Sequence, residues 1–293
     1  MLEIRSLTKR FGDFVALDDL NMTIPKGAVY GLVGPNGAGK TTIIRHITGI
    51  LRPDSGAITL EGAPVYEDPA TKMRIGYIAD DQFFFNSASI EDMRRFYKGL
   101  YPSFSQERFE KLGQLFELPR KRPIRKFSKG MKKQAAFWLV MSLMPDLLVL
   151  DEPVDGLDPV MRRQILSVVM QDVAERGTTV LVSSHNLREL EDICDHVGIM
   201  HRGKMLLEKS LADMQGGTVK VQLVGEIPES FEVLSRDQAG RLTTAVVRAT
   251  AEEAQAILEG AELSYFEVLP LSLEEIFIYE LGGVSYEVKN LLV

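Results

Sequence analysis

The sequence is poor in cysteine and lacks long apolar runs. Its 293 residues include one cysteine, Cys194, so no disulfide can form within the chain. A lone cysteine fits a reducing compartment, and the simplest interpretation of Cys194 is a small buried apolar residue. The longest apolar runs, such as residues 137–144, fall far short of the roughly 20 residues that cross a bilayer. No apolar block follows the basic residues near the N-terminus, so we expect no signal peptide and a cytoplasmic location.

Basic residues are scarce in the last quarter of the chain. Residues 218–293 carry five Lys or Arg against thirteen Asp or Glu, a net charge of −8, whereas the preceding part is close to neutral. An acidic surface repels a phosphate backbone, so we expect no nucleic-acid partner. The change of charge follows "MQGG" at residues 214–217, a flexible break. Together they predict a first domain over residues 1–215 and a separate accessory domain over residues 218–293.

What the sequence does contain is an alternation of strand and helix patterns. Residues 2–12 and 16–25 predict two antiparallel strands joined by a turn at residues 12–13. From residue 28 onward, short apolar strands alternate with helices, which predicts a mostly parallel sheet with helices on both faces. Residues 88–145 are largely helical in pattern, with Ser105 as one N-cap, and predict an inserted helical lobe. Residues after 217 predict a small α+β unit that ends in a helix capped by Ser272, with Glu274 and Glu275 in its first turn.

The stretch "GPNGAGKTT" fits the pattern G-x-x-x-x-G-K-[ST], between a predicted strand and a predicted helix. Its glycines permit a tight turn that points backbone N–H groups inward, and the helix N-terminus adds positive partial charge. Lys40 can then reach the β- and γ-phosphates of a nucleotide, Thr41 can offer its hydroxyl to Mg²⁺, and Thr42 can contact the α-phosphate. The predicted nucleotide-binding residues of this phosphate-binding loop are Gly34, Asn36, Gly37, Ala38, Gly39, Lys40, Thr41 and Thr42.

A second motif, "LLVLDEP", places two carboxylates at the end of a buried strand. Asp151 can hold Mg²⁺ directly or through water. Glu152 is one residue farther on, so its side chain can point at the γ-phosphate rather than at the metal. We therefore predict Glu152 as the general base, or the residue that positions the attacking water, in hydrolysis.

These two motifs occur with "FSKGMKKQ" and "LVSSH" in an order and spacing that resemble the ATP-binding cassette (ABC) ATPases over residues 1–215. The resemblance implies an α/β, P-loop NTPase fold with an antiparallel β subdomain and an inserted helical lobe, here followed by a small C-terminal α+β domain. It also implies hydrolysis of ATP with Mg²⁺.

The resemblance assigns roles to five further positions. Phe11 matches the aromatic that stacks on adenine, although it could also be a packed strand residue. His185 matches the histidine that contacts the γ-phosphate. Ser128 and Gly130 belong to the signature loop, residues 127–134, which binds the γ-phosphate of ATP held by a partner subunit. Asp158, in "GLDP", matches the acid of a loop through which two subunits contact each other.

The sequence departs from the family pattern near three of these motifs. Asp80 stands where the family usually has Gln or Glu; it could orient water or meet the metal, and Gln82 could substitute for it. Val154 and Asp155 replace small polar residues before "GLDP". The run "FFF", residues 83–85, belongs either to the core of the helical lobe or to an exposed groove that receives a membrane partner.

The resemblance implies an ATP-hydrolysing subunit that forms a homodimer, or a heterodimer with a second ABC ATPase, over two ATP molecules. It would drive a membrane permease on a separate chain and so lie at the inner face of the cell membrane. Lys129 in the signature loop, the single cassette and the acidic C-terminal unit resemble bacterial exporter-type cassettes, so we expect export. The alternative is a soluble ABC ATPase that acts on the ribosome or on nucleic acid. Whether the C-terminal unit acts as a sensor or stabilises a dimer stays open.

Overall fold

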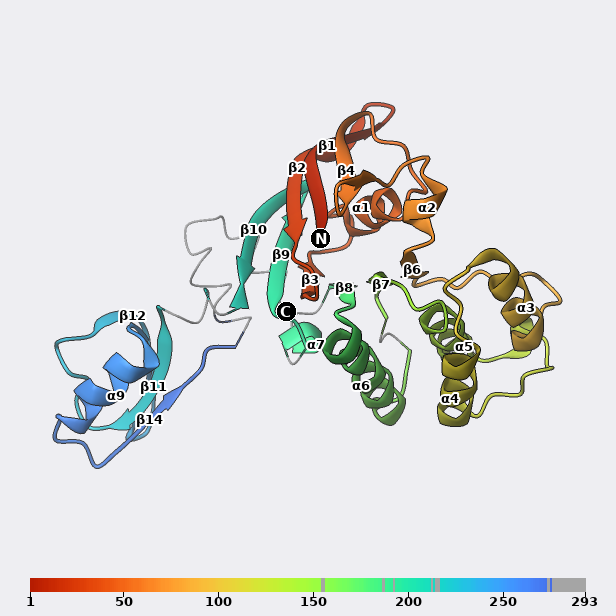
Figure 1. Cartoon of the computed structure of the whole chain (residues 1–293). Coiled ribbons are helices and arrows are strands. Elements are labelled where there is room, and N and C mark those ends of the chain that lie inside the picture. The colour runs from red at the N-terminus through yellow and green to blue at the C-terminus, as the bar shows by residue number, and fades with distance from the viewer. Residues whose placement is uncertain are drawn as a thin grey trace. The chain divides into compact units, whose positions relative to one another are not determined.

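The computed structural model describes residues 1–153, 156–185, 188–191, 193–211, 213, 217–272 and 275 of the chain. They form two compact units (Figure 1). The first unit comprises Met1–His185 and His196–Glu208, and the second comprises Asn186–Asp195 and Lys209–Val293. The domain boundary that the sequence predicts near residues 215–218 falls beside residues outside the described part, and it stays a prediction. No helix in the described part is both long and apolar enough to cross a membrane.

The first unit begins with an antiparallel sheet in the order β2-β1-β4-β5. In β1 and β2, Leu2 pairs with Ile24 and Phe11 pairs with Phe14, so the predicted pair of antiparallel strands is confirmed. Gly12, with a φ of 59°, adopts the left-handed conformation that the tight turn between them requires. The strands are β1 (Leu2–Phe11), β2 (Phe14–Ile24), β4 (Ser55–Leu60) and β5 (Ala63–Pro64).

The larger sheet of the first unit has the order β10-β9-β3-β8-β7-β6. Its strands from β9 to β6 are parallel, as predicted. Every residue of β3, β7 and β8 is buried, as expected for parallel strands that are covered on both faces. The strands are β3 (Val29–Val33), β6 (Ile75–Ile78), β7 (Leu147–Asp151), β8 (Thr179–Ser184), β9 (His196–His201) and β10 (Lys204–Ser210).

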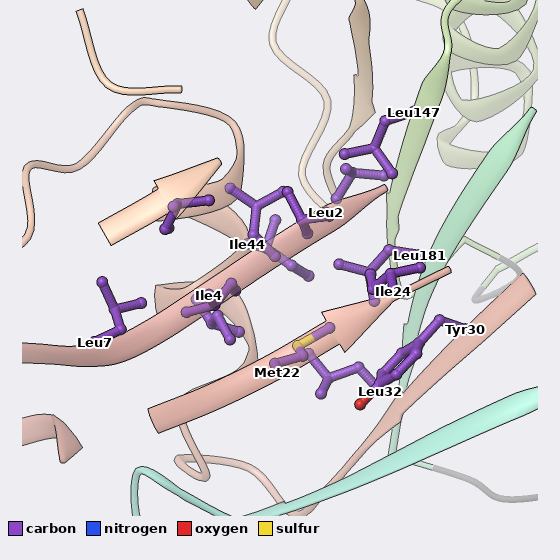
Figure 2. Close-up of a cluster of buried hydrophobic side chains, with 14 of the residues drawn as sticks. Leu2, Ile4, Leu7, Met22, Ile24, Tyr30, Leu32, Ile44, Leu147 and Leu181 are labelled. Atoms are coloured by element: carbon purple, nitrogen blue, oxygen red, sulfur yellow. The ribbon is translucent and has the colours of Figure 1, made fainter. Parts of the chain in front are cut away.

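One apolar core joins the two sheets (Figure 2). Leu2 and Ile24 from the antiparallel sheet pack in the same cluster as Leu147 and Leu181 from the parallel sheet, together with Ile44 of helix α1 (Lys40–Ile47). Each is fully buried, or nearly so, which stabilises the fold by roughly 1.5–3 kcal/mol per side chain. The core therefore fixes α1 and the loop before it against the carboxyl ends of the parallel strands.

Three helices form the helical lobe, which the sequence predicts within residues 88–145. Ser105 caps α4 by accepting a hydrogen bond from the backbone N–H of Arg108, as predicted. Trp138 of α5 stacks on Phe109 of α4 with 4.8 Å between ring centroids, and its Nε1 donates to the Phe109 carbonyl. The lobe contains α3 (Ile90–Leu100), α4 (Gln106–Phe116), the 3-10 turn η1 (Ile124–Lys126) and α5 (Lys129–Met141). The remaining helices of the first unit are α2 (Pro69–Lys72) and α6 (Pro159–Arg176).

The run of three phenylalanines is not part of the lobe core. The side chain of Phe83 is 85% exposed and that of Phe85 is 51% exposed. Their rings make edge contacts with each other, and Phe85 contacts Phe96 of α3 in the same way. The core interpretation of Phe83 and Phe85 is therefore wrong, because the loop after β6 turns these side chains outward.

The second unit contains a four-stranded antiparallel sheet in the order β12-β13-β11-β14. Val221 and Leu223 of β11 pack against Ala254 and Leu258 of helix α9. The elements are α7 (Arg188–Glu191), β11 (Val219–Val224), β12 (Glu232–Ala239), β13 (Leu242–Arg248), α9 (Ala251–Glu259) and β14 (Tyr265–Leu269). The α+β composition that the sequence predicts is thus observed.

Two single-residue predictions fall in the second unit. The Ser272 hydroxyl accepts from the backbone N–H of Glu275, as expected of an N-cap. The rest of the predicted last helix, with Glu274, lies outside the described residues. Cys194 is a buried free cysteine, as expected, and burial raises the pKa of its thiol.

Candidate functional site

The phosphate-binding loop connects the carboxyl end of β3 to the first residue of α1. A Cβ atom on Gly34 would lie 2.4 Å from the carbonyl oxygen of Met200, so only glycine fits at this close approach to β9. Gly39 has a φ of 110° and forms the N-cap of α1. These two glycines let the chain turn sharply from strand to helix, which leaves the helix N-terminus facing the loop.

Lys40 is almost fully buried at the start of α1, with 6% of its side chain exposed. Its Nζ donates to the Gly34 carbonyl at 2.5 Å and lies 3.7 Å from Oε1 of Glu152. Burial lowers the pKa of Lys40, while the charges of Glu152 and Asp151 oppose that effect. An anionic ligand in the loop would further favour the charged ammonium.

A pocket of about 310 Å³ lies over the phosphate-binding loop. It brings the loop together with carboxylates from two neighbouring strand ends, β6 and β7. Its lining residues are Phe14, Ala16, Pro35, Asn36, Gly37, Gly39, Lys40, Thr41, Thr42, Asp80, Asp151 and Glu152. Seven of the site residues predicted from the sequence, all of them within the described part, do not line this pocket: Phe11, Gly34, Ala38, Ser128, Gly130, Asp158 and His185.

Asp151 is the last residue of β7 and is 4% exposed. Its Oδ1 accepts a 2.6 Å hydrogen bond from the hydroxyl of Ser183, its register partner on β8. Sequence reasoning did not single out Ser183, although its position near the end of the "LVSSH" strand was a usable signal. The hydrogen bond fixes the carboxylate rotamer, so that Asp151 faces the pocket in a defined orientation.

The oxygen atoms around the pocket suit a hard cation. Thr41, Asp80 and Asp151 all line it, and they offer one hydroxyl and two carboxylates. Within the described residues, no group of three or more His, Cys, Asp or Glu could hold a metal ion by itself. One hydroxyl and two carboxylates fit Mg²⁺, because this ion commonly binds through one or two carboxylates and completes its shell with water and substrate phosphates.

Glu152 follows β7 in the left-handed conformation, with a φ of 47°. Its backbone N–H lies 3.2 Å from the carbonyl oxygen of Ser183, and its Oε2 lies 3.0 Å from Nδ1 of His185. Its own carbonyl accepts from Nζ of Lys133 at 2.7 Å. His185 therefore contacts the predicted base, although it does not line the pocket. Lys133 was not among the predicted site residues.

Asp80, rather than Gln82, lines the pocket in this structure. The Gln82 side-chain amide donates instead to the carbonyl of Ala79. Oδ1 of Asp80 lies 3.5 Å from Nζ of Lys133. The carboxylate of Asp80 thus has a cationic partner, Lys133, within the same chain. A glutamine at position 80 is neutral and would not need such a partner.

The signature loop lies away from the pocket of its own chain. The hydroxyl of Ser128 accepts from the backbone N–H of Met131 and caps α5. A Cβ atom on Gly130 would lie 3.3 Å from the carbonyl oxygen of Gly156, so the signature loop adjoins the loop that contains Asp158. Asp158 itself caps α6.

Val154 and Asp155 lie outside the described residues, between the end of β7 and the "GLDP" stretch.

The turn between β1 and β2 brings an aromatic ring to the pocket, but not the one that the sequence predicts. Phe14 lines the pocket, whereas Phe11, its cross-strand partner, does not. Phe11 is 49% exposed, and Nζ of Lys9 lies 5.6 Å from the centre of its ring. It is therefore not a packed strand residue.

The chain is similar to known ATP-binding proteins of ABC transporters. The ABC transporter family model matches residues 17–155. The ABC transporter ATP-binding protein YtrB of Bacillus subtilis is 31% identical, over 97% of this chain and 99% of its own length. The lantibiotic transport ATP-binding protein SrtF of Streptococcus pyogenes is 36% identical, over 71% of this chain and 90% of its own.

A solved structure extends this result to the fold. The structure of an ATP-binding subunit of an ABC transporter superposes with a TM-score of 0.68 at 30% identity, over 73% of this chain and 92% of that one. Residues 17–155, which the family model matches, include the phosphate-binding loop and the carboxylates that line the pocket. The chain therefore belongs to the ABC transporter family, as an ATP-hydrolysing ATP-binding subunit with the P-loop NTPase fold.

Proposed function

We propose that this subunit binds ATP with Mg²⁺ over its phosphate-binding loop, closes with a second cassette, and drives export through a permease on a separate chain. The main support is that Lys40 and the Glu152 carboxylate meet in one pocket, 3.7 Å apart, beside Asp151. This pocket combines a cation for phosphates, oxygen ligands for a metal and a carboxylate base.

The proposal assigns a role to each residue of the site. Lys40 and the N–H groups of the loop, from Gly34 to Thr42, bind the β- and γ-phosphates. Glu152 accepts the proton of the attacking water, and His185, at 3.0 Å from its Oε2, orients that carboxylate and contacts the γ-phosphate. Asn36, Gly37, Ala38 and Gly39 supply the backbone of the phosphate-binding loop.

Thr41, Asp151 and Asp80 are proposed to hold Mg²⁺. When bound, the ion neutralises charge on the transferred phosphoryl group. The chain itself contributes the orientation of the ligands. Ser183 holds Oδ1 of Asp151, and Lys133 balances the charge of Asp80. Asp80 is also proposed to help position the attacking water.

The proposed dimer places the signature loop of one subunit over the ATP of the other. Ser128 and Gly130 do not line the pocket of their own chain, so their predicted contact with a γ-phosphate requires a second cassette. Asp158 lies in the neighbouring loop and is proposed to contact the partner subunit. The N-terminus of α5 offers positive partial charge to that phosphate.

The permease contact is proposed at the aromatic strip, which we define as Phe83, Phe85 and Phe96. These rings are exposed and adjacent, and each is at least 45% accessible. Exposed aromatic side chains in contact with one another often mark a protein–protein interface. Binding there would hold the subunit at the inner face of the membrane.

Export is the proposed direction for two reasons. Lys129 in the signature loop resembles exporter-type cassettes, and the similar protein SrtF has a name that assigns it to lantibiotic transport. The alternative of a ribosome- or nucleic-acid-directed ATPase is not favoured, because the similar proteins are transport subunits and residues 218–293 are acidic.

The first experiment is the size in solution of the Glu152→Gln variant, with and without ATP and Mg²⁺. We expect a shift from monomer to dimer with ATP, because binding remains while hydrolysis stops. The matched control is the Lys40→Ala, Glu152→Gln double variant, which should stay monomeric. If the single variant binds ATP yet stays monomeric, the homodimer is excluded and a second cassette or the permease must complete the site.

The permease proposal is tested with membrane proteins encoded beside this gene. The chain, co-expressed with them, should sediment with membranes, and a Phe83→Ser, Phe85→Ser variant should remain in the supernatant. Equal sedimentation of both forms would exclude the aromatic strip as the contact. ATP-dependent uptake of the substrate into inside-out vesicles would establish export, and uptake into right-side-out vesicles would establish import.

A further inference from the structure

Lys133 is a buried lysine that none of the motif assignments explains. It lies on α5, five residues after Ser128, and 1% of its side chain is exposed. It is one of the largest fully buried side chains in the described part of the chain. Burying an ammonium group is costly unless it is paired and hydrogen-bonded. The partners of Lys133 therefore indicate why a lysine is present.

Two of these partners belong to the nucleotide site. Nζ donates to the Glu152 carbonyl at 2.7 Å and lies 3.5 Å from Oδ1 of Asp80. Glu152 follows β7, Asp80 follows β6, and Lys133 comes from the helical lobe. One ammonium group thus connects the proposed base, the wall of the pocket and the helix that begins at the signature loop.

The contact to Glu152 bears on a strained segment of backbone. A non-glycine residue in the left-handed region costs on the order of 1–3 kcal/mol, and Glu152 adopts it with a φ of 47°. This conformation determines the direction of the Glu152 side chain, which reaches both Lys40 and His185. The hydrogen bond from Lys133 to the carbonyl of the same residue helps to hold that conformation.

We propose that Lys133 is a positioning residue for ATP hydrolysis. Its ammonium group holds the backbone of Glu152 so that the carboxylate points into the pocket, and it pairs with Asp80. This inference rests on the proposed role of Glu152 as the base. It also explains the departure at position 80, because an aspartate there balances the buried charge of Lys133 and a glutamine would not.

The first test is the Lys133→Met variant, which keeps an unbranched side chain, one atom shorter than that of lysine, and removes the charge and the donor. We expect kcat to fall by about 10²-fold, since small displacements of a catalytic group have effects of that size. KM and the Kd for ATP should stay within about threefold, because Lys40 and the loop remain. The matched control is Lys111→Met, an exposed lysine of α4, which should keep the wild-type rate.

Stability distinguishes positioning from a structural role. Removing one partner of an ion pair is costly when the other charge is left buried, but the Asp80 side chain is 48% exposed and stays solvated without Lys133. We therefore expect the urea midpoint of Lys133→Met to be unchanged or higher while kcat falls. If Lys133→Met fails to fold, Lys133→Gln, whose side chain is one bond shorter, is measured in the same way. A wild-type kcat in a folded variant would overturn the proposal.

The second test needs no hydrolysis. Urea midpoints without nucleotide are compared for Asp80→Asn in the wild-type chain and in the Lys133→Met background. We expect Asp80→Asn to lower the midpoint only where Lys133 is present, because there it removes a negative charge that lies 3.5 Å from the buried ammonium. Equal shifts in both backgrounds would overturn the pairing of the two side chains.

The role of Glu152 as the base and the positioning role of Lys133 can be refuted separately. If Glu152→Gln hydrolyses ATP at the wild-type rate, the base assignment is wrong, whatever the coupling between Asp80 and Lys133. If Glu152→Gln is inactive and Lys133→Met is fully active, only the positioning role of Lys133 is wrong.

Discussion

Nδ1 of His185 lies 3.0 Å from Oε2 of Glu152, although the two residues are 33 positions apart in the chain. His185 directly follows β8 and Glu152 directly follows β7, and these strands are parallel neighbours. The carboxyl ends of parallel strands meet at one edge of a sheet, so each strand can supply one residue to a common site. The contact therefore follows from strand order rather than from local sequence.

Glu152→Gln is expected to lower kcat by at least about 10²-fold, because the amide cannot accept a proton from the attacking water. The Kd for ATP should stay within about threefold. Phosphate release and titration calorimetry measure the two effects. Glu175→Gln, an exposed carboxylate on α6, is the control and should hydrolyse ATP normally. Wild-type turnover by Glu152→Gln would show that another residue is the base.

His185→Ala is expected to lower kcat by about 10–10³-fold, with a smaller effect on KM. The reason is the loss of a donor to the γ-phosphate and of the partner that orients Glu152. His185→Gln keeps a side-chain donor and should retain more activity than His185→Ala. Steady-state kinetics of the three proteins are the measurement. Equal rates for wild type and His185→Ala would remove this residue from the mechanism.

Phe14→Ala is expected to weaken ATP binding by about 5–100-fold, since stacking of a base on an aromatic ring contributes about 1–3 kcal/mol. Phe11→Ala should have a smaller effect, because only Phe14 lines the pocket. Titration of both variants with ATP compares them directly, and each serves as the control for the other. A larger loss for Phe11→Ala would instead support the position that the family resemblance assigns.

Phe83→Ser is expected to change the free energy of unfolding by less than about 0.5 kcal/mol, because the ring is exposed. Trp138→Ala, in the core of the same lobe, should cost about 3–5 kcal/mol. Urea denaturation of both variants measures the difference. A decrease of more than about 2 kcal/mol in the free energy of unfolding of Phe83→Ser would show that the Phe83 side chain is buried in the core.

Acid is expected to remove a contribution of Glu61 to stability. Hydrogen bonds from Arg74 and Lys26 lower the pKa of Glu61 to about 2, against a usual value of 4.5. Because the folded-state pKa is the lower one, the contribution is complete above about pH 4.5. It is lost as the pH falls towards 2.

The measurement is urea denaturation of wild type and Glu61→Gln between pH 6 and pH 2.5. The difference in stability between the two proteins should stay constant above about pH 5 and shrink as the pH falls from about 5 to 2.5. A difference that is independent of pH would show that the carboxylate is not held in this way. Other paired carboxylates affect both proteins equally, so the comparison isolates Glu61.

Local chemistry explains which features could be predicted from the sequence. The phosphate-binding loop needs its residue types at consecutive positions, so Gly34–Thr42 identify it without a structure. The turn at residues 12–13 predicted the β1–β2 pair, and the alternation of short apolar strands with helices predicted the parallel sheet. Caps such as Ser105 and Ser272 depend on residues three positions away, and both were predictable for that reason.

The tertiary structure decided which distant side chains meet. Lys133 and Glu152 are 19 residues apart, and their contact depends on how α5 packs against the end of β7. The loop after β6 turns Phe83 outward, and the turn between β1 and β2 brings Phe14, rather than Phe11, to the pocket. By itself, the sequence determined the phosphate-binding loop and the carboxylate pair, because each is encoded within a few adjacent residues. The order and spacing of four such motifs indicated the family. The partners of those residues were set by packing between segments, which no local pattern records.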